Sequence, residues 1–224
     1  MASIGGANIV TEGLVLCLDA ANRRSYPGSG TVWSDLSGNN NSGSLTNGPT
    51  FSSDNYGAIV FDGTNDHVNM GSLNLQQNWT LETFCNMTND TDFGIFGQGI
   101  GVLNQGLHII YQSGARGMIY GMYSNDNDYQ NNYRTTINVW NHWVFTYNNS
   151  TFTKQFYANT ILQTPGASVQ NQYQGSGQFN VAGAYSSASS PANGKFAIAR
   201  MYNRVLSASE ILQNYNGTKS RYGL

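Results

Sequence analysis

The chain has 224 residues and a formal net charge of −2, and only 10% of its residues are charged. This length is typical of one large all-β domain, and the weak charge, with no basic stripe to neutralise phosphates, argues against a nucleic-acid partner. No long apolar run predicts insertion into a membrane, and residues 1–11 lack the charged and apolar regions of a cleavable signal peptide.

Glycine and asparagine dominate the turn-forming part of the composition, with 26 glycines in the chain. Because both residue types tolerate positive φ, the composition favours short strands joined by tight turns. An aromatic content of 12% excludes a disordered chain. Cys17 and Cys85 both lie in apolar, strand-like segments, which favours two buried free thiols over a disulfide.

The first predicted strand is the apolar run 13–18, which ends at Asp19. Such a run is typical of a strand that is central in a sheet or buried on both faces. Residues 22–55 follow as a long segment rich in turn residues. A loop of this length is unusual unless it is functional or wraps the core, and Trp33 and Leu36 are the side chains expected to hold it there.

Two hairpins are predicted further along the chain. Strands at 58–61 and 67–70 flank the Gly- and Asn-containing turn 62–66. Strands at 139–147 and 153–157 flank a second turn, made of two asparagines and a serine. Each pattern is a strand, a turn signal and a second strand, so each predicts an antiparallel pair.

The segment from Trp79 to Cys85 is predicted to be a strand with one apolar face, because Trp79, Leu81, Thr83 and Cys85 alternate along it. The four tryptophans of the chain are expected in the core. Further short strands are predicted at 93–96, 107–111, 118–123, 179–184 and 194–202.

One helix is predicted, from Ser207 to about Asn214. Ser207 as N-cap with Glu210 at the third helical position forms a capping box, and Leu206 with Ile211 forms the matching hydrophobic staple. About a dozen short strands, one helix and no alternation of strands with helices predict an all-β sandwich or barrel.

Three segments carry a resemblance to a known family. Residues 59–68 resemble its F-D-G-x-x-D hairpin, with His67 where an aromatic residue is usual. Residues 140–147 are similar to its W-x-H strand, and residues 194–211 are similar to its closing strand and helix motif. The chain thus resembles the laminin-G-like, concanavalin A-like lectin-glucanase family, although residues 157–160 stand where the family commonly has Asn-Gly.

The resemblance implies an all-β fold, a two-sheet antiparallel jelly-roll β-sandwich (concanavalin A-like) with one short C-terminal helix. It implies one laminin-G-like domain over residues 1–224, with 1–12 as an N-terminal arm. Because a fold does not determine a function, the function needs separate evidence.

The front of the chain carries a narrower resemblance. Its segments are similar to laminin-G-like proteins of tailed bacteriophages, which serve as capsid decoration, tail or fibre components. This likeness implies a virion structural and interaction protein, assembled in the host cytoplasm. The implied partners are other virion subunits, further copies of the chain as a homo-oligomer, and host surface glycans. The segments are 9–16, 18–22, 25–33, 35–39 and 45–49.

No catalytic set is predicted. Jelly-roll glycosidases related to this family place paired carboxylates on alternate positions of one strand, which directs both into the cleft. The three glutamates Glu12, Glu82 and Glu210 have no acidic neighbour at i+2 or i+4. Glu210 belongs to the helix cap, Glu82 is expected to face solvent, and His142 is expected to be a packed structural histidine. A glycoside hydrolase is therefore the least favoured function.

The resemblance also raises calcium binding, because many family members hold Ca²⁺ through oxygen ligands in rim loops. Asp126 and Asp128 share one loop, and Asp62 and Asp66 flank a turn. The alternative is that these side chains form the hydrogen bonds of turns. No cofactor is required by the sequence, and Ca²⁺ remains a candidate ligand.

Residues 124–134 are the candidate ligand-binding or partner-binding segment. This polar stretch contains Tyr129, Tyr133 and Arg134, and tyrosine and arginine are favoured at interfaces, on loops that a rigid sandwich supports. The alternative is an ordinary solvated loop. Two functions therefore stay open: a virion protein that interacts with neighbouring subunits, and a carbohydrate-binding lectin module.

Overall fold

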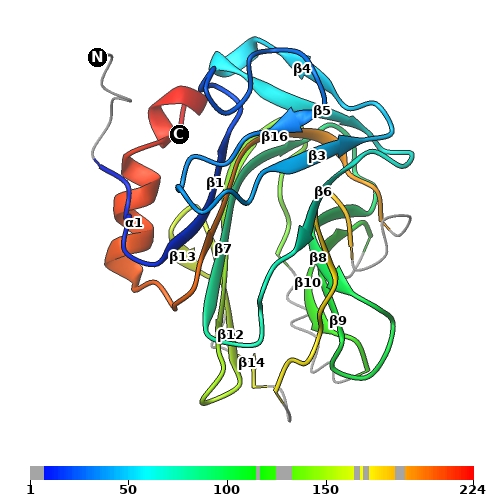
Figure 1. Ribbon diagram of the computed structural model, residues 1–224, viewed down its shortest axis with the longest axis vertical. Helices are drawn as coiled ribbons and strands as arrows, with labels where there is room; N and C mark the ends of the chain where they lie inside the picture. The colour runs from blue at the N-terminus through cyan, green and yellow to red at the C-terminus, as the bar shows by residue number, and fades with distance from the viewer. Residues whose placement is uncertain (1–7, 115–116, 125–132, 164–166, 169–171, 185–189) are drawn as a thin grey trace.

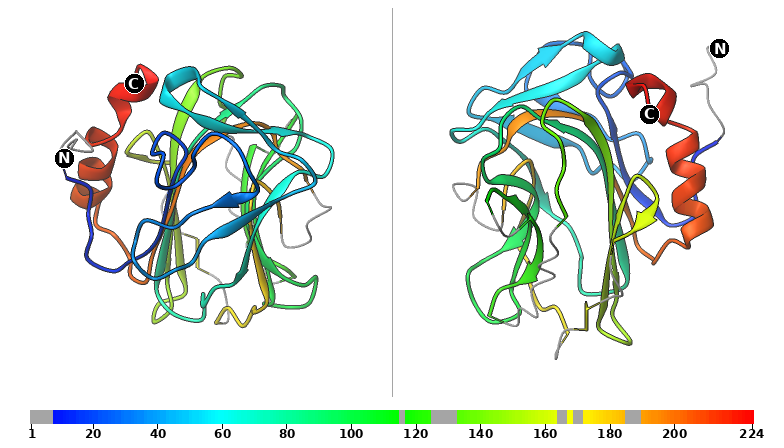
Figure 2. Two further views of the ribbon diagram at one scale, coloured as in Figure 1. Left: turned by 45° about the horizontal axis from the view of Figure 1, so that its top comes forward. Right: turned by 180° about the vertical axis from the view of Figure 1, so that it is seen from behind.

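The computed structural model describes residues 8–114, 117–124, 133–163, 167–168, 172–184 and 190–224. Two antiparallel sheets face each other across a shared hydrophobic core (Figures 1 and 2). A helix, α1 (Ala208–Asn216), covers the outer side of one sheet. The predicted two-sheet sandwich with one short C-terminal helix is confirmed.

The larger sheet has nine strands. Beside the main order, β1 (Leu14–Asp19) pairs with β16, and β14 (Ala167–Ser168) pairs with β12. The main order is β13 (Ile161–Leu162), β12 (Thr153–Ala158), β11 (Trp140–Asn148), β7 (Trp79–Met87), β16 (Asn193–Tyr202), β5 (Ala58–Asp62) and β4 (Thr50–Ser52).

The smaller sheet has seven strands. The order is β10 (Gly117–Met122), β9 (Gly106–Gln112), β8 (Phe93–Gly99), β15 (Gln178–Val181), β6 (His67–Ser72), β3 (Gly43–Thr46) and β2 (Val32–Trp33). Two 3₁₀ turns complete the description, η1 (Asp54–Tyr56) and η2 (Lys219–Tyr222).

Alternation along the strands fills the core between the sheets. Trp79, Leu81 and Cys85 of β7 point into that core, as predicted, while Phe84 packs on the outer face in a separate cluster with Tyr222 of η2. The central strands of the nine-stranded sheet are thus buried on both faces, because the C-terminal segment covers their outer side.

The tryptophans and cysteines lie where the sequence predicts them. Trp33, Trp79 and Trp143 are fully buried, and Trp140 is nearly so. Both cysteines are buried free thiols. Among the described residues, no helix is both long and apolar enough to cross a membrane.

The predicted hairpin of residues 58–70 is wrong, whereas the hairpin of β11 and β12 is confirmed. Strand β5 pairs with β4 and β16 in the larger sheet, and β6 pairs with β3 and β15 in the smaller one. The turn 63–66 therefore carries the chain from one sheet to the other. Turn residues specify a chain reversal, but the neighbours available to each strand decide which sheet it joins.

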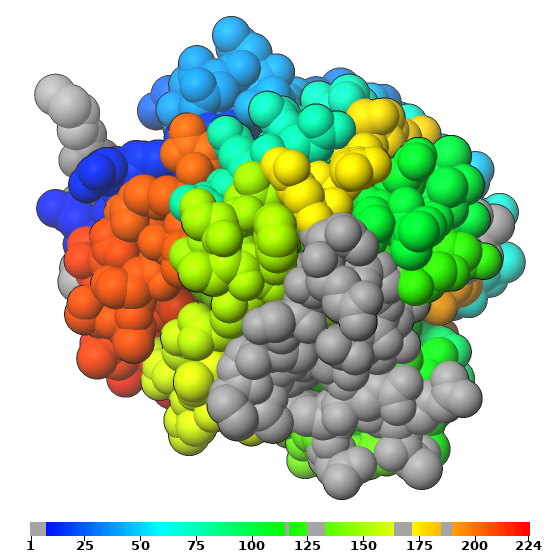
Figure 3. Space-filling model, turned by 90° about the horizontal axis from the view of Figure 1, so that it is seen from below, coloured from blue at the N-terminus to red at the C-terminus, as the bar shows by residue number. Residues whose placement is uncertain are grey.

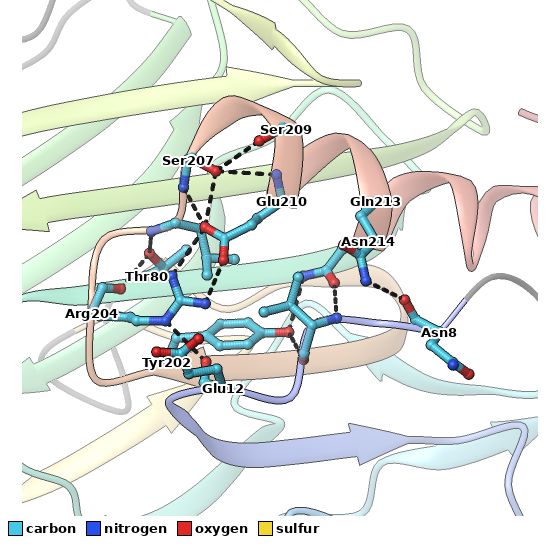
Figure 4. A network of polar contacts seen from close by, with 12 residues as sticks. Asn8, Glu12, Thr80, Tyr202, Arg204, Ser207, Ser209, Glu210, Gln213 and Asn214 are labelled. Carbon is cyan, nitrogen blue, oxygen red and sulfur yellow. Dashed lines mark hydrogen bonds and ion pairs between the residues drawn. The ribbon is translucent and has the colours of Figure 1, made fainter.

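Helix α1 begins as the sequence predicts. The Ser207 side chain accepts a hydrogen bond from the Glu210 amide, and the Glu210 carboxylate accepts one from the Ser207 amide (Figure 4). Leu206 and Ile211 lie in one apolar cluster with Val10. The N-terminal segment also docks here, because the Val10 amide donates to Asn214 Oδ1 at 2.8 Å.

Loops from three parts of the chain close one end of the sandwich. Figure 3 shows the β8–β9 loop (green), residues 172–178 (yellow) and the β11–β12 loop (yellow-green) on this face. The Gln174 amide donates to the Asn104 carbonyl at 2.9 Å, which ties two of these loops together. Strand β9 starts here, so its last residues lie at the opposite end of the sandwich.

Candidate functional site

Three consecutive residues at the end of β9 each contact one charged side chain. The Tyr111 hydroxyl donates to Asp90 Oδ1 at 3.4 Å. The Ser113 amide donates to Asp92 Oδ1 at 3.2 Å, and Arg134 Nη1 donates to the Gln112 carbonyl at 3.4 Å. We call this group the β9 rim. It comprises Asp90, Asp92, Tyr111, Gln112, Ser113 and Arg134.

Strand pairing brings the two aspartates to this place. Phe93, the first residue of β8, is the register partner of Tyr111. The residues just before β8 must then lie beside the residues at the end of β9, which is where Asp90 and Asp92 meet Tyr111 and Ser113. The segment that precedes β8 and the segment that follows β9 therefore lie side by side at one end of this strand pair.

Tyr133 anchors the segment that carries Arg134. Its ring packs edge-on against Phe156 and Trp143, with centroid distances of 5.3 Å and 6.4 Å. Its hydroxyl accepts from Trp143 Nε1 and donates to Asn141 Oδ1, both at 3.3 Å. Burial raises the pKa of this phenol. The structure thus places the predicted Tyr133 half inside the sandwich, where it positions its neighbour.

The β9 rim offers both hydrogen-bond donors and acceptors to solvent. Arg134, Asp90 and Asp92 are all exposed. Within the described ranges, no carboxylate forms an ion pair with Arg134. A guanidinium and two carboxylates on one edge suit a polyhydroxylated ligand, because charged groups form the stronger hydrogen bonds to neutral partners.

The remaining predicted site residues fall into two groups, of which only one lies within the described residues. Tyr129, Asp126 and Asp128 lie outside the described residues. Asp62 and Asp66 lie together at the turn between β5 and β6, where Asp62 Oδ1 accepts from the Thr64 amide at 2.7 Å and Asp66 Oδ2 accepts from the Asp62 amide at 3.2 Å.

Asp66 is the more enclosed of these two carboxylates. It is buried, Asp66 Oδ1 has no hydrogen-bond partner in the described part of the chain, and burial raises the pKa of the group. Ca²⁺ takes about 6–8 oxygen ligands. Among the described residues, no three His, Cys, Asp or Glu side chains are grouped as a metal site would need. Calcium binding at Asp62 and Asp66 stays a prediction.

Glu82 does not face solvent, contrary to the prediction. It lies on the outer face of β7 beneath α1, with no exposed surface. Glu82 Oε1 accepts from Arg200 Nη1 at 2.9 Å and pairs with His142 Nε2 at 2.8 Å. Glu82 Oε2 accepts from Asn214 Nδ2 at 2.8 Å. Helix α1 hides this carboxylate, and strand alternation alone does not reveal which strand face a helix will cover.

Charge and hydrogen bonding hold Glu82 ionised. Burial by itself would raise its pKa, but the Arg200 charge and the His142 and Asn214 hydrogen bonds outweigh burial and leave the pKa below its ordinary value. His142 stacks on Phe84 with a centroid distance of 4.5 Å, and it is fully buried, as the sequence predicts. We call Glu82, Arg200, His142 and Asn214 the buried ionic cluster.

The other two glutamates are arranged differently. Glu210 forms two hydrogen bonds with Arg204, and these, against the effect of burial, lower its pKa to about 2 (Figure 4). Glu12 is exposed, and its backbone carbonyl accepts from Arg204 Nε at 3.0 Å. The three glutamates thus lie at three separate positions around α1, with Glu82 alone inside the protein.

Solved structures share this architecture at low sequence identity. The Trypanosoma rangeli sialidase in complex with sialic acid matches with a TM-score of 0.70 and 15% identity over 93% of this chain and 33% of that chain. The chain thus spans about a third of the sialidase. The receptor-binding domain of botulinum neurotoxin C/D mosaic serotype matches with a TM-score of 0.64 and 13% identity, over 93% of this chain and 52% of that chain.

A third match is similar in size to this chain. Domain 4 of AbnA, an extracellular arabinanase from Geobacillus stearothermophilus, in complex with arabinotriose, has a TM-score of 0.73 and 16% identity over 91% of this chain and 98% of that chain. At these identities the matches show the fold alone. None of the curated protein sequences compared with the chain matches it.

The sequence profile of one family does match. The profile described as the concanavalin A-like lectin/glucanases superfamily covers residues 62–212. This range extends from the last residue of β5 into α1, and so includes the β9 rim and every residue of the buried ionic cluster except Asn214. The chain is therefore a member of the concanavalin A-like lectin/glucanase superfamily.

Proposed function

We propose that the protein is a non-catalytic binding protein of a bacteriophage particle, and that its β9 rim recognises carbohydrate. The observation that carries the carbohydrate part is that exposed Arg134, Asp90 and Asp92 contact three consecutive residues, the last two of β9 and the one that follows it. Side chains held in this way by backbone and hydroxyl contacts can bind a sugar with little further loss of freedom.

The comparisons support a carbohydrate ligand by analogy. The matched arabinanase domain was solved in complex with arabinotriose, and this chain covers 98% of that domain. An oligosaccharide complex is thus known for a protein that matches this fold over nearly its whole length. The burial of Glu82 beneath α1 favours binding over hydrolysis, because a general acid must reach the glycosidic oxygen.

A glycan array tests the carbohydrate proposal. We expect the native chain to retain at least one oligosaccharide class, and Arg134→Ala to weaken that binding by at least about tenfold, because a hydrogen bond to a charged group contributes about 1.5–3 kcal/mol. Asp90→Asn with Asp92→Asn should weaken it as well. Arg23→Ala, which removes another exposed arginine, serves as the matched control and should bind as the native chain does.

The array is run both with added Ca²⁺ and with a chelator. Binding that needs Ca²⁺ would support a calcium site in a rim loop. The absence of any retained glycan under both conditions would contradict the carbohydrate proposal. Release of reducing sugar by the native chain, abolished in Glu82→Gln, would contradict the non-catalytic proposal.

The virion setting is supported by the front of the chain. Its resemblance to phage laminin-G-like proteins covers residues that lie outside the matched range 62–212. These residues form most of β1 in the larger sheet, and β2 and part of β3 in the smaller one. The phage-like segments thus contribute strands to both sheets.

Co-sedimentation with intact particles from a producing culture tests the virion proposal. We expect the native protein to sediment with the particles. Many copies over the shell would identify a decoration subunit, and a few copies at one vertex would identify a tail or fibre component. A protein found only in the free fraction would contradict the virion proposal and leave the lectin module as the function.

A further inference from the structure

The turn η1 holds an aromatic residue in an unfavourable backbone conformation. Asn55 and Tyr56 both adopt positive φ, at 51° and 71°. Left-handed backbone costs an L-residue about 1–2 kcal/mol, and asparagine tolerates it better than tyrosine does. Tyr56 is also 75% exposed, the largest exposure among the exposed large hydrophobic side chains of the described chain.

Contacts on both sides of Tyr56 enforce this conformation. Asn55 Oδ1 accepts from Trp140 Nε1 at 3.2 Å, and Asn55 Nδ2 donates to the Arg221 carbonyl at 3.4 Å. Gly57 follows with φ 138°, and a Cβ there would lie 2.7 Å from the Ala20 carbonyl oxygen. The chain is therefore fixed before and after Tyr56.

The polar and aromatic contacts of the Tyr56 side chain do not offset this cost. In the described part of the chain it makes no hydrogen bond, ion pair or ring contact. A strained residue that the surrounding structure holds in place is a recognised feature of binding sites. A tyrosine ring kept in solvent presents a rigid apolar face at a low entropic cost.

The surroundings of Tyr56 are polar. Ser53, Asp54 and Asn55 are exposed, and Asp54 Oδ2 pairs with Lys195 Nζ at 3.2 Å. An aromatic anchor of a protein interface normally sits in an apolar, desolvated patch. A single aromatic face among charged and polar groups instead suits a sugar, which has an apolar ring face and many hydroxyls.

One short segment of chain connects the β9 rim to the turn that carries Tyr56. Arg134 and Trp140 are the two ends of one short segment, and Trp140 contacts the Tyr56 turn through Asn55. Six residues of chain span at most about 22 Å. An oligosaccharide held by Arg134 could therefore extend toward Tyr56.

We propose that Tyr56 is a stacking platform for a sugar ring, and that it forms a second contact of the glycan site at the β9 rim. This inference rests on the proposed carbohydrate function. Asp54, two residues before Tyr56, and its ion-pair partner Lys195 are charged groups available to contact the hydroxyls of the sugar. The unfavourable positive φ of Tyr56 in η1 is then the cost of directing its ring into solvent, where a sugar can reach it.

The experiment compares Tyr56→Gly and Tyr56→Phe with the native chain on an array of immobilised oligosaccharides. Glycine adopts positive φ freely, so Tyr56→Gly should unfold at or above the native midpoint temperature. The same change should weaken array binding by at least about tenfold, as loss of an aromatic anchor does. Tyr56→Phe keeps the ring and should bind within about twofold of the native chain, because the apolar face provides the contact.

Asn40→Gly is the matched control, because Asn40 is another exposed residue at positive φ. This variant should leave array binding unchanged and should raise the unfolding midpoint only slightly.

Native binding that persists in Tyr56→Gly would overturn the proposed role of Tyr56 and leave the β9 rim proposal standing. A lowered unfolding midpoint in Tyr56→Gly would show that the Tyr56 ring stabilises the fold, and would also overturn its role as a sugar platform. A native chain that binds no glycan would overturn both proposals. Loss of particle co-sedimentation alone in Tyr56→Gly would identify a protein contact instead.

Discussion

Replacement of Glu82 by alanine is expected to lower the free energy of unfolding by about 3–5 kcal/mol, the usual result of removing one partner of a buried ion pair. The change leaves the Arg200 guanidinium buried, with Nε already lacking a hydrogen-bond partner in the described structure. It also removes the acceptor of His142 and Asn214. Equilibrium unfolding in urea measures the loss.

Glu12→Ala is the matched control for this change. Glu12 is exposed, and surface substitutions away from special features usually stay within about 0.5 kcal/mol. The buried ionic cluster would not be needed for stability if both variants unfolded at the same urea concentration.

The effect of Glu82 should also depend on pH. Its pKa lies below the ordinary value of 4.5 in the folded protein, so the folded state favours the ionised form. The contribution of Glu82 is fully present above pH values near 4.5 and is lost as the pH falls through the folded pKa. The difference in stability between the native chain and Glu82→Ala should therefore shrink on acidification, which urea unfolding over a pH series would detect.

Gly99→Ala is expected to cost about 2–5 kcal/mol, the sum of left-handed strain of about 1–2 kcal/mol and overpacking of about 1–3 kcal/mol. Gly99 ends β8 at φ 85°, and a Cβ there would overlap the carbonyl oxygen of Gln105. Because that oxygen belongs to the backbone of the same loop, it cannot move without breaking the turn. Urea unfolding again measures the effect.

Gly114→Ala separates the two causes. Gly114 has a similar φ of 71°, but nothing lies within 4 Å of the position that a Cβ would occupy. This variant should show only the strain of about 1–2 kcal/mol. Equal losses in the two variants would mean that the Gln105 carbonyl exerts no steric constraint on Gly99.

Features that depend on residues close in sequence could be predicted directly. The capping box of α1 and the hairpin of β11 and β12 both follow from side chains within a few positions of one another. The apolar face of β7 likewise follows from the alternation of Trp79, Leu81 and Cys85. In each case, the residues that form the recognisable sequence pattern are the same residues that interact in the structure.

Predictions failed where a strand had to choose a distant partner. The sequence predicts a turn at residues 62–66, but β5 and β6 join different sheets, where they pair with β16 and β15 respectively. The sequence alone predicts that Glu82 faces solvent, since a lone charge on a strand is seldom buried. Burial of the Glu82 charge is offset by an ion pair with Arg200, which lies 118 residues away, and the carboxylate is covered by α1.

The candidate site was predicted in part. The polar character of the segment that ends at Arg134 was visible in the sequence, and the structure places Arg134 on an exposed rim. Asp90 and Asp92 were missed, because only the pairing of β8 with β9 brings them there. The sequence does not single out Tyr56 either, because the residue type alone does not show which tyrosine will adopt a positive φ.

The sequence by itself determined the class of fold, the positions of most strands, the helix cap and membership of a lectin-like family, because these depend on alternation, turn chemistry and local motifs. The tertiary structure alone decided which strands share a sheet, that a glutamate lies buried under α1, and which charged groups meet at the β9 rim. Those outcomes depend on contacts between residues far apart in the chain, and their energies exist only once the two sheets and the helix have packed together.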